Sequence, residues 1–417
     1  MNASAQLDLF AQVASAYAEA KQTTLSNDAL YESLMGRMGV SRDVAEKRES
    51  VGRAGQRHSL WKRKIRFAQQ TLKHLGILER DAQKRGIWSL TEAAGKRLHR
   101  AGKGVRLVAF STDLGVAMFA SNNDALAGLD EPISLILTSP PFPLNKPRAY
   151  GNPDPKIFVE WLVRTLEPMV KRLAPGGVLV LQTSPDVFVQ GSPARSLYQE
   201  RLLIALNDEL GLARLLSMPW VNPSKPPAPT HWALKKRVQL VSGHEYVHIL
   251  TNDPLKCKAD NRRVLEAHSE RHKALMAAGG EQREASYGDG AYTLRPGSFG
   301  RETSGRIPRN YVEMGHRCAD TLAMRKHAAS LGLPPHGAMF PTKLPSFLIQ
   351  YLTEPGDLVF DPFAGSCKTG LAAERLGRRW LMAEVVLEYT RTAAEAFRSF
   401  DGFWMSPALA CVGETPC

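Results

Sequence analysis

Two apolar segments, far apart in the chain, each lead directly into a turn of unusual composition. Residues 133–137 (ISLIL) precede residues 139–142 (SPPF), and residues 358–360 (LVF) precede residues 361–366 (DPFAGS). Apolar runs without polar alternation are typical of strands buried on both faces of a parallel sheet. Because helical patterns follow both turns, the sequence predicts an α/β fold with a Rossmann-like, doubly wound sheet.

Strands and helices alternate over most of the chain after residue 112. Hydrophobic periodicity predicts helices at residues 157–173, 196–210, 344–352, 369–376 and 389–398, and further strands at residues 178–181, 238–250 and 380–383. Residues 251–335 interrupt this pattern, because Arg, Lys, Gly and Pro are frequent there and no strand is evident. We expect an insertion of irregular structure in that region.

The first hundred or so residues have a different pattern, in which helices precede a basic hairpin. Helices are predicted at residues 7–21, 27–38 and 60–75, and residues 23–26 (TTLS) could cap the second of them. Two short strands follow at residues 77–80 and 86–90, with a basic turn between them, and another helix begins at residue 91. This order of elements predicts a winged helix.

The positive charge of the chain is concentrated in one segment. The net charge is +13, and residues 52–106 contain 15 Lys and Arg against 3 Asp and Glu. Such a concentration is typical of a surface that contacts nucleic-acid phosphates, although a solvated helical face would have a similar composition. Lys62, Arg63 and Arg66 lie on the outward face of the predicted helix and are candidate DNA contacts.

Composition excludes several other classes of protein. The hydrophobic fraction of 43% and the charged fraction of 23% are those of a globular protein, and no apolar run has the length of a membrane span. The first ten residues lack the pattern of a secretion signal. The five cysteines are odd in number and scattered, without paired zinc spacing. We expect a cytoplasmic protein with reduced thiols, no metal site and no membrane association.

The turn at residues 361–366 has the features of a cofactor site. Gly365 allows a tight turn and a close approach of ligand to backbone, and amide groups at the start of the following helix can hold a carboxylate. Glu384 ends the next strand about 20 residues further on, where an acid can accept hydrogen bonds from ribose hydroxyls. No Gly-x-Gly-x-x-Gly pattern is present, which argues against a nicotinamide enzyme and favours S-adenosylmethionine. The alternative is a tight turn without a ligand.

The turn at residues 139–142 can orient an exocyclic amine. Two prolines fix the backbone and leave carbonyl groups without local partners, so that these carbonyls and the Ser139 hydroxyl can accept hydrogen bonds from the amine. Phe142 offers a flat face on which a base can stack. A proline-rich loop that merely ends a strand is the alternative interpretation.

Together these motifs resemble the β-class amino-methyltransferases of DNA, in the N4-cytosine group. In that family the catalytic tetrapeptide precedes the target-recognition region, which precedes the cofactor motif. Further matching segments lie at residues 220–226, 244–245, 336–341 and 384–389, and the resemblance covers residues 112–400. Ser at the first catalytic position is typical of cytosine N4 enzymes. Cys367 departs from the pattern, because many methyltransferases have glycine there.

The resemblance implies a set of functional residues. The catalytic residues would be Ser139, Pro140, Pro141 and Phe142. Pro341, Thr342 and Lys343 would contact the methionine part of S-adenosylmethionine, and the rest of the cofactor would be lined by Asp361, Phe363, Gly365, Ser366, Thr369 and Glu384. Trp220 and Asn222 would lie near a flipped base. For His231 and His244 we expect a structural role rather than a functional one. In the insertion, base edges or phosphates could be contacted by Arg262, Arg263, Arg301, Arg306 and Arg309.

The N-terminal segment resembles the Mrr-type winged helix of restriction-associated proteins, through residues 75–78 and 86–91. We therefore expect a winged-helix DNA-binding domain at residues 1–108. The catalytic half of the methyltransferase domain would span 109–250, a target-recognition insertion 251–335, the cofactor-binding half 336–405, and a tail 406–417.

The expected activity is methylation of cytosine N4 in duplex DNA, within a restriction-modification system. The chain would act as a monomer or dimer and could have a cognate restriction endonuclease as a partner. Three alternatives stay open: an adenine N6 methyltransferase, a non-catalytic DNA-binding regulator with a methyltransferase fold, and a methyltransferase of RNA or protein.

Overall fold

The computed structural model describes residues 24–51, 56–74, 77–81, 84–90, 98–144 and 153–410, together with residue 412 and a few residues between 9 and 20. Most of the helix predicted at residues 7–21, the start of the helix predicted from residue 91 and most of the C-terminal tail lie outside the described residues.

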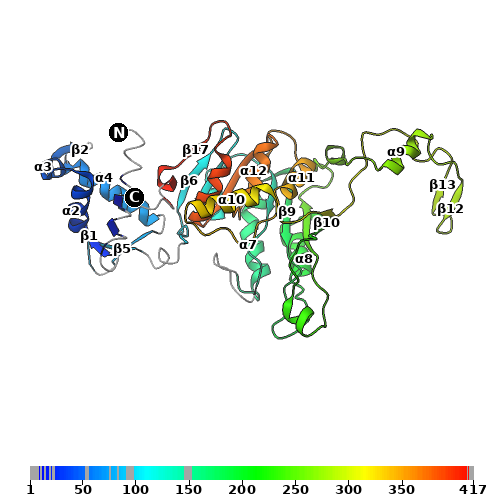
Figure 1. Ribbon diagram of the computed structural model, residues 1–417, viewed down its shortest axis with the longest axis horizontal. Helices are drawn as coiled ribbons and strands as arrows, with labels where there is room; N and C mark the ends of the chain where they lie inside the picture. Colours follow the sequence, from blue (N-terminus) through cyan, green and yellow to red (C-terminus); the bar gives the residue numbers. More distant parts are fainter. Residues whose placement is uncertain are drawn as a thin grey trace.

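A 10-stranded sheet forms the centre of the molecule (Figure 1). Its middle consists of five parallel strands in the order β9-β8-β15-β16-β7. Their bounds are β7 (Gly115–Ala120), β8 (Ile133–Thr138), β9 (Leu173–Thr183), β15 (Leu358–Asp361) and β16 (Arg379–Glu384). The predicted α/β sheet is confirmed, and the two apolar segments that predicted it form neighbouring strands, β8 and β15.

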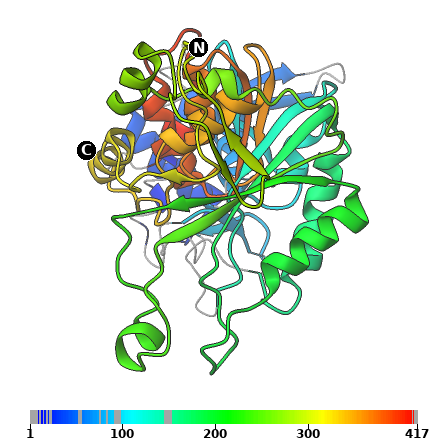
Figure 2. The ribbon, with the colours of Figure 1, turned by 90° about the vertical axis from the view of Figure 1, so that its right-hand side faces the viewer.

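Shorter or antiparallel strands extend the sheet on both sides. They are β11 (His244–Thr251), β10 (Ala213–Val221) and β14 (Val312–Glu313) on one side, and β6 (Arg106–Ser111) and β17 (Trp404–Met405) on the other. The strand predicted at 238–250 begins only at His244. The residues before it belong to a loop that carries a π-helix, η2 (Thr230–Lys235), and extends away from the sheet (Figure 2).

Helices cover both faces of the sheet, and the side chains of β8 alternate between the two cores. Leu135 and Leu137 pack in the core that includes α11 (Lys343–Leu352), α12 (Lys368–Arg375) and α13 (Leu387–Ala394). Ile136 packs in the opposite core, with α6 (Asn122–Leu126), α7 (Phe158–Val170) and α8 (Tyr198–Leu210). Burial on both faces explains why this strand has no polar alternation.

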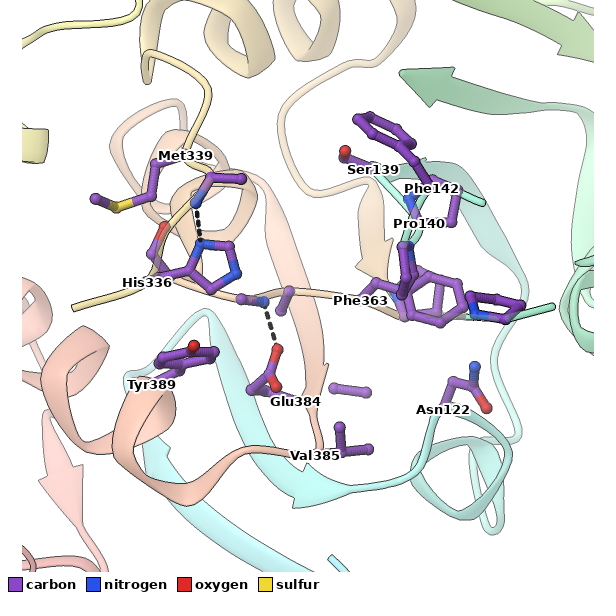
Figure 3. A pocket seen from close by; sticks show the side chains of 18 of the residues that line it. Asn122, Ser139, Pro140, Phe142, His336, Met339, Phe363, Glu384, Val385 and Tyr389 are labelled. Atoms are coloured by element: carbon purple, nitrogen blue, oxygen red, sulfur yellow. Dashed lines mark hydrogen bonds between the residues drawn. The ribbon is translucent and has the colours of Figure 1, made fainter. Parts of the chain in front are cut away.

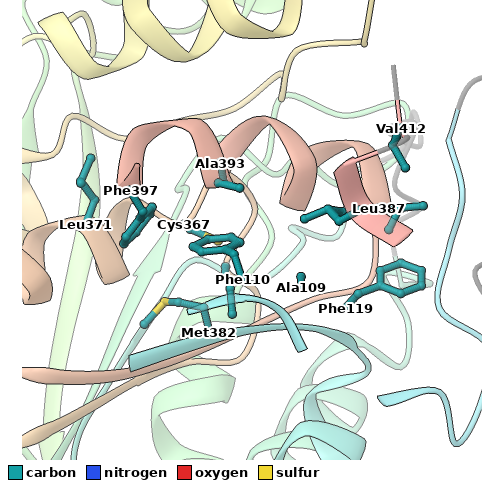
Figure 4. Packing of buried hydrophobic residues seen from close by; sticks show 14 of the residues in the cluster. Ala109, Phe110, Phe119, Cys367, Leu371, Met382, Leu387, Ala393, Phe397 and Val412 are labelled. Carbon is teal, nitrogen blue, oxygen red and sulfur yellow. The ribbon is translucent and has the colours of Figure 1, made fainter. Parts of the chain in front are cut away.

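The cores are closely packed around aromatic rings. The Phe110 ring lies 5.0 Å from the Phe397 ring, centroid to centroid, between the sheet and the segment α13–η4 (η4, Glu395–Phe397) (Figure 4). The short helix α14 (Pro407–Ala410) adds Leu409 to the same cluster. This core lies directly behind the turn after β15, so that it supports the loop from the inside.

In the N-terminal domain, the helices predicted at residues 27–38 and 60–75 and the two short strands after them are present, whereas the strand β1 (Thr24–Ser26) and the short helix α3 (Arg42–Glu46) were not predicted. The strands of this domain form a sheet in the order β1-β5-β4, and its other elements are α2 (Asn27–Met38), α4 (Leu60–His74), β4 (Leu78–Arg80) and β5 (Ile87–Leu90). Ser26 caps α2, because its hydroxyl accepts a hydrogen bond of 3.1 Å from Ala29 N. A hairpin of β2 (Arg48–Val51) and β3 (Gln56–Ser59) precedes α4 and was not predicted.

The region of residues 251–335 is more regular than expected. It contains η3 (Asn261–Val264), α9 (Glu270–Ala277), the hairpin β12 (Ala285–Tyr287) and β13 (Tyr292–Leu294), and α10 (Ala319–Ser330). The hairpin and α9 extend away from the sheet (Figure 1), whereas Met324 and Ala328 of α10 are buried. The expectation of irregular structure was therefore wrong: the strands of three residues are too short to produce a periodic pattern, and the helices α9 and α10 were also missed.

Candidate active site

The two turns identified in the sequence are held together at the carboxyl ends of β8 and β15. Thr138 Oγ1 donates a hydrogen bond of 2.6 Å to Asp361 Oδ1, and Thr369 Oγ1 donates one of 2.6 Å to Asp361 Oδ2. Phe363 N donates to the same carboxylate at 3.0 Å. Burial raises the pKa of Asp361 to about 6, and these three donors favour its ionised form. One buried side chain thus joins the end of β8, the following turn and α12.

A cavity of about 460 Å³ lies at this edge of the sheet (Figure 3). Both turns line it. Of the residues predicted as a site, the cavity is lined by Ser139, Pro140, Pro141, Phe142, Phe363, Gly365, Ser366 and Glu384. In Figure 3, Ser139 and Phe142 lie at one end of the cavity, whereas Glu384 and Val385 lie toward the other. The sequence motifs therefore converge on a single concave space.

Other predicted residues lie outside the cavity lining. Asp361 and Thr369 face each other behind the turn. Pro341 and Thr342 are buried at the start of α11, where Thr342 O accepts a hydrogen bond of 2.8 Å from Ser346 Oγ, and Lys343 is exposed. The cavity is instead lined by residues just before them, namely His336, Ala338, Met339 and Phe340.

Trp220 and Asn222 also lie away from the cavity lining. Trp220 is 5% exposed, and its indole N–H donates a hydrogen bond of 2.8 Å to the carbonyl of Met314. Asn222 follows at the end of β10, where its Oδ1 accepts hydrogen bonds from the backbone N and the Oγ of Ser224. Trp220 therefore holds the segment around Met314 against β10, whereas Asn222 shapes the turn that follows β10.

Gly365 is constrained both by its backbone and by its surroundings. Its φ of +53° lies in the left-handed region, and a Cβ at this position would lie 2.9 Å from His336 Nε2. The His336 ring packs edge-on against Tyr389, with 4.7 Å between ring centroids. Cys367 has φ +55° and is also left-handed, which explains why glycine is common at this position in the family that the sequence resembles. Its buried thiol belongs to the core shown in Figure 4.

Glu384 ends β16 with its carboxylate next to Gly365. Its Oε2 accepts a hydrogen bond of 2.6 Å from Gly365 N, and its Oε1 accepts one of 2.8 Å from Val386 N. Burial raises the pKa of Glu384 to about 7, while these backbone donors favour its ionised form. Each carboxylate oxygen retains a lone pair that can accept a further hydrogen bond from a ligand in the cavity.

A chain of polar groups orients Ser139 from behind. The Ser139 hydroxyl donates to Gln182 Oε1 at 2.5 Å, and Gln182 Nε2 donates to the Glu245 carboxylate. Lys225 Nζ lies 3.3 Å from Glu245 and 3.1 Å from Asp186. Because a carboxylate only accepts, Glu245 fixes which end of the Gln182 amide faces Ser139. The Ser139 proton is thus engaged, and its oxygen is left as an acceptor.

Sequence reasoning missed Gln182 and several residues of the cavity wall. Those that lay outside the matched segments are Arg100, Ser121, Asn122, Leu144, Pro153, Ile157, Trp161, Lys368 and Ala383. Lys368 is 1% exposed, and its Nζ donates to the Phe340 carbonyl at 2.9 Å, which holds the loop before α11 against the start of α12. Lys368 could have been identified from the sequence, because it lies three residues after Gly365 in the predicted turn. For the others, only their positions near helix starts or strand ends could have indicated the cavity.

The three basic candidates on α4 differ in their surroundings. Arg63 is exposed. Lys62 forms an ion pair of 2.6 Å with Glu46 and lies over the Tyr31 ring, and Arg66 Nε donates to Tyr31 Oη at 3.1 Å. Only part of the charge predicted on this helix is therefore directed to solvent.

The arginines of the insertion divide in the same way. Arg262 pairs with Asp260 at 2.8 Å and Arg306 with Glu266 at 2.5 Å, while Arg263 donates to the Tyr351 carbonyl at 3.1 Å. Arg301 and Arg309 are exposed and form no ion pair within the described part of the chain. His231 and His244 contact neighbouring aromatic rings, Trp232 and Tyr246, and neither lines the cavity.

Comparison with known proteins identifies two families and two relatives that the sequence matches. Residues 133–395 match the DNA methylase family, and residues 9–100 match the Mrr N-terminal domain. The type II methyltransferase M.PvuII of Proteus hauseri is 34% identical over 300 residues, which are 70% of this chain and 86% of that protein. The type II methyltransferase M.BglII of Bacillus subtilis is 23% identical over 265 residues, or 63% of each protein.

A solved structure of a DNA methyltransferase is similar to this chain in its fold. The PvuII DNA methyltransferase, described as cytosine-N4-specific, is similar with a TM-score of 0.54 and 30% sequence identity, over 73% of this chain and 92% of that one. Among the residues that our structure describes, no helix is long and apolar enough to cross a membrane.

Proposed function

The chain belongs to the DNA methylase family, and we propose that it transfers a methyl group from S-adenosylmethionine to the exocyclic N4 amine of cytosine in duplex DNA. One observation carries the proposal. The hydrogen bond between Thr138 and Asp361 holds the ends of β8 and β15 together, so that Ser139 and Gly365 line the same cavity. An amine acceptor and a cofactor turn are thereby placed next to each other.

The residues of the cavity fit the proposed cofactor. Glu384 can accept the two ribose hydroxyls, since its carboxylate is already oriented by two backbone N–H groups. At Gly365 the absence of a Cβ leaves the space that His336 borders. The amide groups at the start of α12 favour a carboxylate at the amino-acid end. S-adenosylmethionine supplies an electrophilic methyl group for transfer to the amine.

At the transfer end, the protein's task is to orient a neutral amine and exclude water. Ser139 Oγ can accept one amine hydrogen because its own proton is directed to Gln182. The Pro140 carbonyl is a second acceptor, so the nitrogen lone pair is directed toward the cavity. Fixed geometry of this kind supplies much of the acceleration in reactions that join two bound groups. No nucleophilic cysteine is required, because the amine attacks directly.

The target base must leave the duplex to reach Ser139. Rotation of a nucleotide out of the stack costs a few kcal/mol, about the free energy that stacking on an aromatic side chain returns. Phe142 lines the cavity beside Ser139 and is the expected stacking partner (Figure 3). The resemblance to the N4-cytosine group, in which Ser is typical at the first catalytic position, here Ser139, favours cytosine over adenine as the target.

The other parts of the chain would bind DNA and select the site. The N-terminal domain at residues 1–108 would contact phosphates through Arg63 and its neighbours, and exposed Arg301 and Arg309 would reach the target from the insertion. We further propose a role in a restriction-modification system in the cytoplasm, in which a cognate endonuclease could be a partner of a monomer or dimer.

Analysis of modified nucleosides tests this function directly. The full chain would be expressed in a host that lacks DNA methylation, and its DNA digested and analysed by mass spectrometry. We expect N4-methyldeoxycytidine with the parent chain and a strong loss with Phe142→Ala. N6-methyldeoxyadenosine would identify the alternative base. If S-adenosylhomocysteine binds but no modified base forms in DNA, methylation of DNA is refuted, which leaves a non-catalytic DNA-binding regulator or a methyltransferase of RNA or protein.

A further inference from the structure

The segment that leaves the N-terminal domain lies against the cofactor end of the cavity. Residues 99–101 pair with the segment that follows Glu384. Arg100 and Val386 form an antiparallel bridge, Ala101 N donates to the Val385 carbonyl at 2.8 Å, and Leu387 N donates to the His99 carbonyl at 2.9 Å. The backbone that carries Glu384 and Val385 therefore has the N-terminal junction as its direct neighbour.

A buried carboxylate fixes this junction in place. Glu388, in the first turn of α13, has a side chain that is 2% exposed. Its Oε2 accepts a hydrogen bond of 2.9 Å from His99 N, and its Oε1 is in contact with His99 Nδ1. A carboxylate removed from water needs such partners, so His99 and Glu388 hold each other in one arrangement. The position of the next residue, Arg100, is constrained as a result.

Arg100 lines the cavity, although this residue belongs to neither of the two sequence motifs from which the cavity was predicted. In an extended segment successive side chains point to opposite sides, so the contact of His99 with Glu388 leaves Arg100 on the other side. There it lines the cavity, beside the backbone of Val385 and Val386. In Figure 3, Glu384 and Val385 lie at the end of the cavity away from Ser139 and Phe142, where the ribose and adenine would lie if Glu384 holds the ribose.

We infer that Arg100 is a cofactor-binding residue, supplied by the junction with the N-terminal domain, whose guanidinium group packs on the adenosine part of S-adenosylmethionine. The inference rests on the proposed cofactor site. A guanidinium group is planar, stacks on aromatic faces and donates hydrogen bonds along its edge, which suits a neutral purine with ring nitrogens. The amide groups at the start of α12 already favour a carboxylate at the amino-acid end of the cofactor, so Arg100 is not needed there.

Equilibrium binding of two ligands to the full chain tests this assignment. S-adenosylhomocysteine contains both ends of the cofactor, whereas 5′-methylthioadenosine lacks the amino-acid part. For Arg100→Ala we expect both dissociation constants to rise by about tenfold, the equivalent of one stacked cation. Arg100→Lys should restore little of this loss, because the planar group is absent. Lys103→Ala, an exposed residue of the same segment outside the cavity lining, should bind both ligands like the parent chain.

The outcomes separate this inference from the proposed function. If the parent chain binds S-adenosylhomocysteine and Arg100→Ala binds it equally well, the role of Arg100 is refuted while the cofactor site stands. If Arg100→Ala weakens the binding of S-adenosylhomocysteine but not that of 5′-methylthioadenosine, Arg100 contacts the amino-acid part of the cofactor and not the adenosine part, which refutes the inference. An unchanged affinity for both ligands with weaker DNA binding would make it a phosphate contact instead. Failure of the parent chain to bind either ligand would overturn both proposals.

Discussion

The cavity at the sheet edge and the basic surfaces of the molecule differ in how their functional groups are held. At the cavity, each key side chain is fixed by buried partners, as Thr138 is by Asp361 and Glu384 by the backbone of Gly365 and Val386. On α4 and in the insertion, the basic groups have mixed surroundings: Arg63 is exposed, Arg262 is exposed but pairs with Asp260, and Arg66 donates a hydrogen bond to Tyr31.

This difference shows where the sequence alone can predict which residues form a site. A parallel sheet gathers the ends of distant strands at one edge, so residues at strand ends converge whatever their separation in the chain. No sheet brings the residues of a basic segment together at one place. Its net charge therefore does not show which of its side chains are free to contact DNA. Substitutions at the cavity should therefore have large, local effects, and those on the basic surfaces should have small, graded effects that depend on salt.

Gly365→Ala should have the largest effect. A Cβ adds left-handed strain of about 1–2 kcal/mol and contacts His336 Nε2, so the turn must shift and the hydrogen bond from Gly365 N to Glu384 is lost. We expect the affinity for S-adenosylhomocysteine, measured by calorimetry, to fall about a hundredfold, or roughly 2.7 kcal/mol. Gly377→Ala is the matched control, because Gly377 is also left-handed (φ +68°) but nothing lies within 4 Å of its Cβ position. Equal affinities for the two variants would refute the account of this turn.

Phe142→Ala should separate chemistry from cofactor binding. Loss of the stacking face removes about 1–3 kcal/mol, so single-turnover methylation of a DNA duplex should slow by roughly 5- to 150-fold. Affinity for S-adenosylhomocysteine should stay near that of the parent chain, since Phe142 lies at the transfer end of the cavity. An unchanged methylation rate would show that the base does not stack on this ring.

Cofactor affinity should depend on pH through Glu384. The raised pKa of this carboxyl, about 7, means that it is protonated below that pH, where it can no longer accept two ribose hydroxyls. Binding favours the ionised form, so affinity for S-adenosylhomocysteine should be full above pH 7 and fall by up to about tenfold per pH unit below it. Glu384→Gln should bind weakly with a flatter profile. The same pH dependence in both chains would assign the titration to another group.

The basic surface should give the smallest effect. Replacement of exposed Arg63 by Ala should reduce the slope of log affinity for duplex DNA against log salt by about one. Lys62→Ala removes the same charge from the next position, but that charge is already paired with Glu46 at 2.6 Å, so the slope should change less. Identical slopes for the two variants would contradict the distinction between open and paired cations.

Much of the fold could be predicted because its strands and helices are strongly patterned. Residues 27–38 and 60–75 were predicted as helices close to the bounds of α2 and α4, and buried β8 and β15 were recognised from their apolar runs. Strands β6, β7 and β10 were missed. Gly, Ala and Met weaken the signal in β7, and β6 and β10 are partly exposed at the sides of the sheet.

The candidate site could be predicted only as far as its motifs reach. Residues 139–142 and 363–366 were found because each follows a buried strand. Gln182 could not be found, since its contact with Ser139 depends on the register between β8 and β9. Asp361 was assigned to the cofactor from its position in the motif, whereas the carboxylate lies behind the turn with Thr138 and Thr369 as partners.

A crystal structure of the full chain with S-adenosylhomocysteine tests the central claim most directly, namely that two distant turns form one site for methyl transfer. We predict that both ribose hydroxyls lie within hydrogen-bond distance of Glu384 and that the sulfur atom faces Ser139 and Phe142 across the cavity. A ligand bound elsewhere, or bound here with its sulfur directed away from Ser139, would contradict the account.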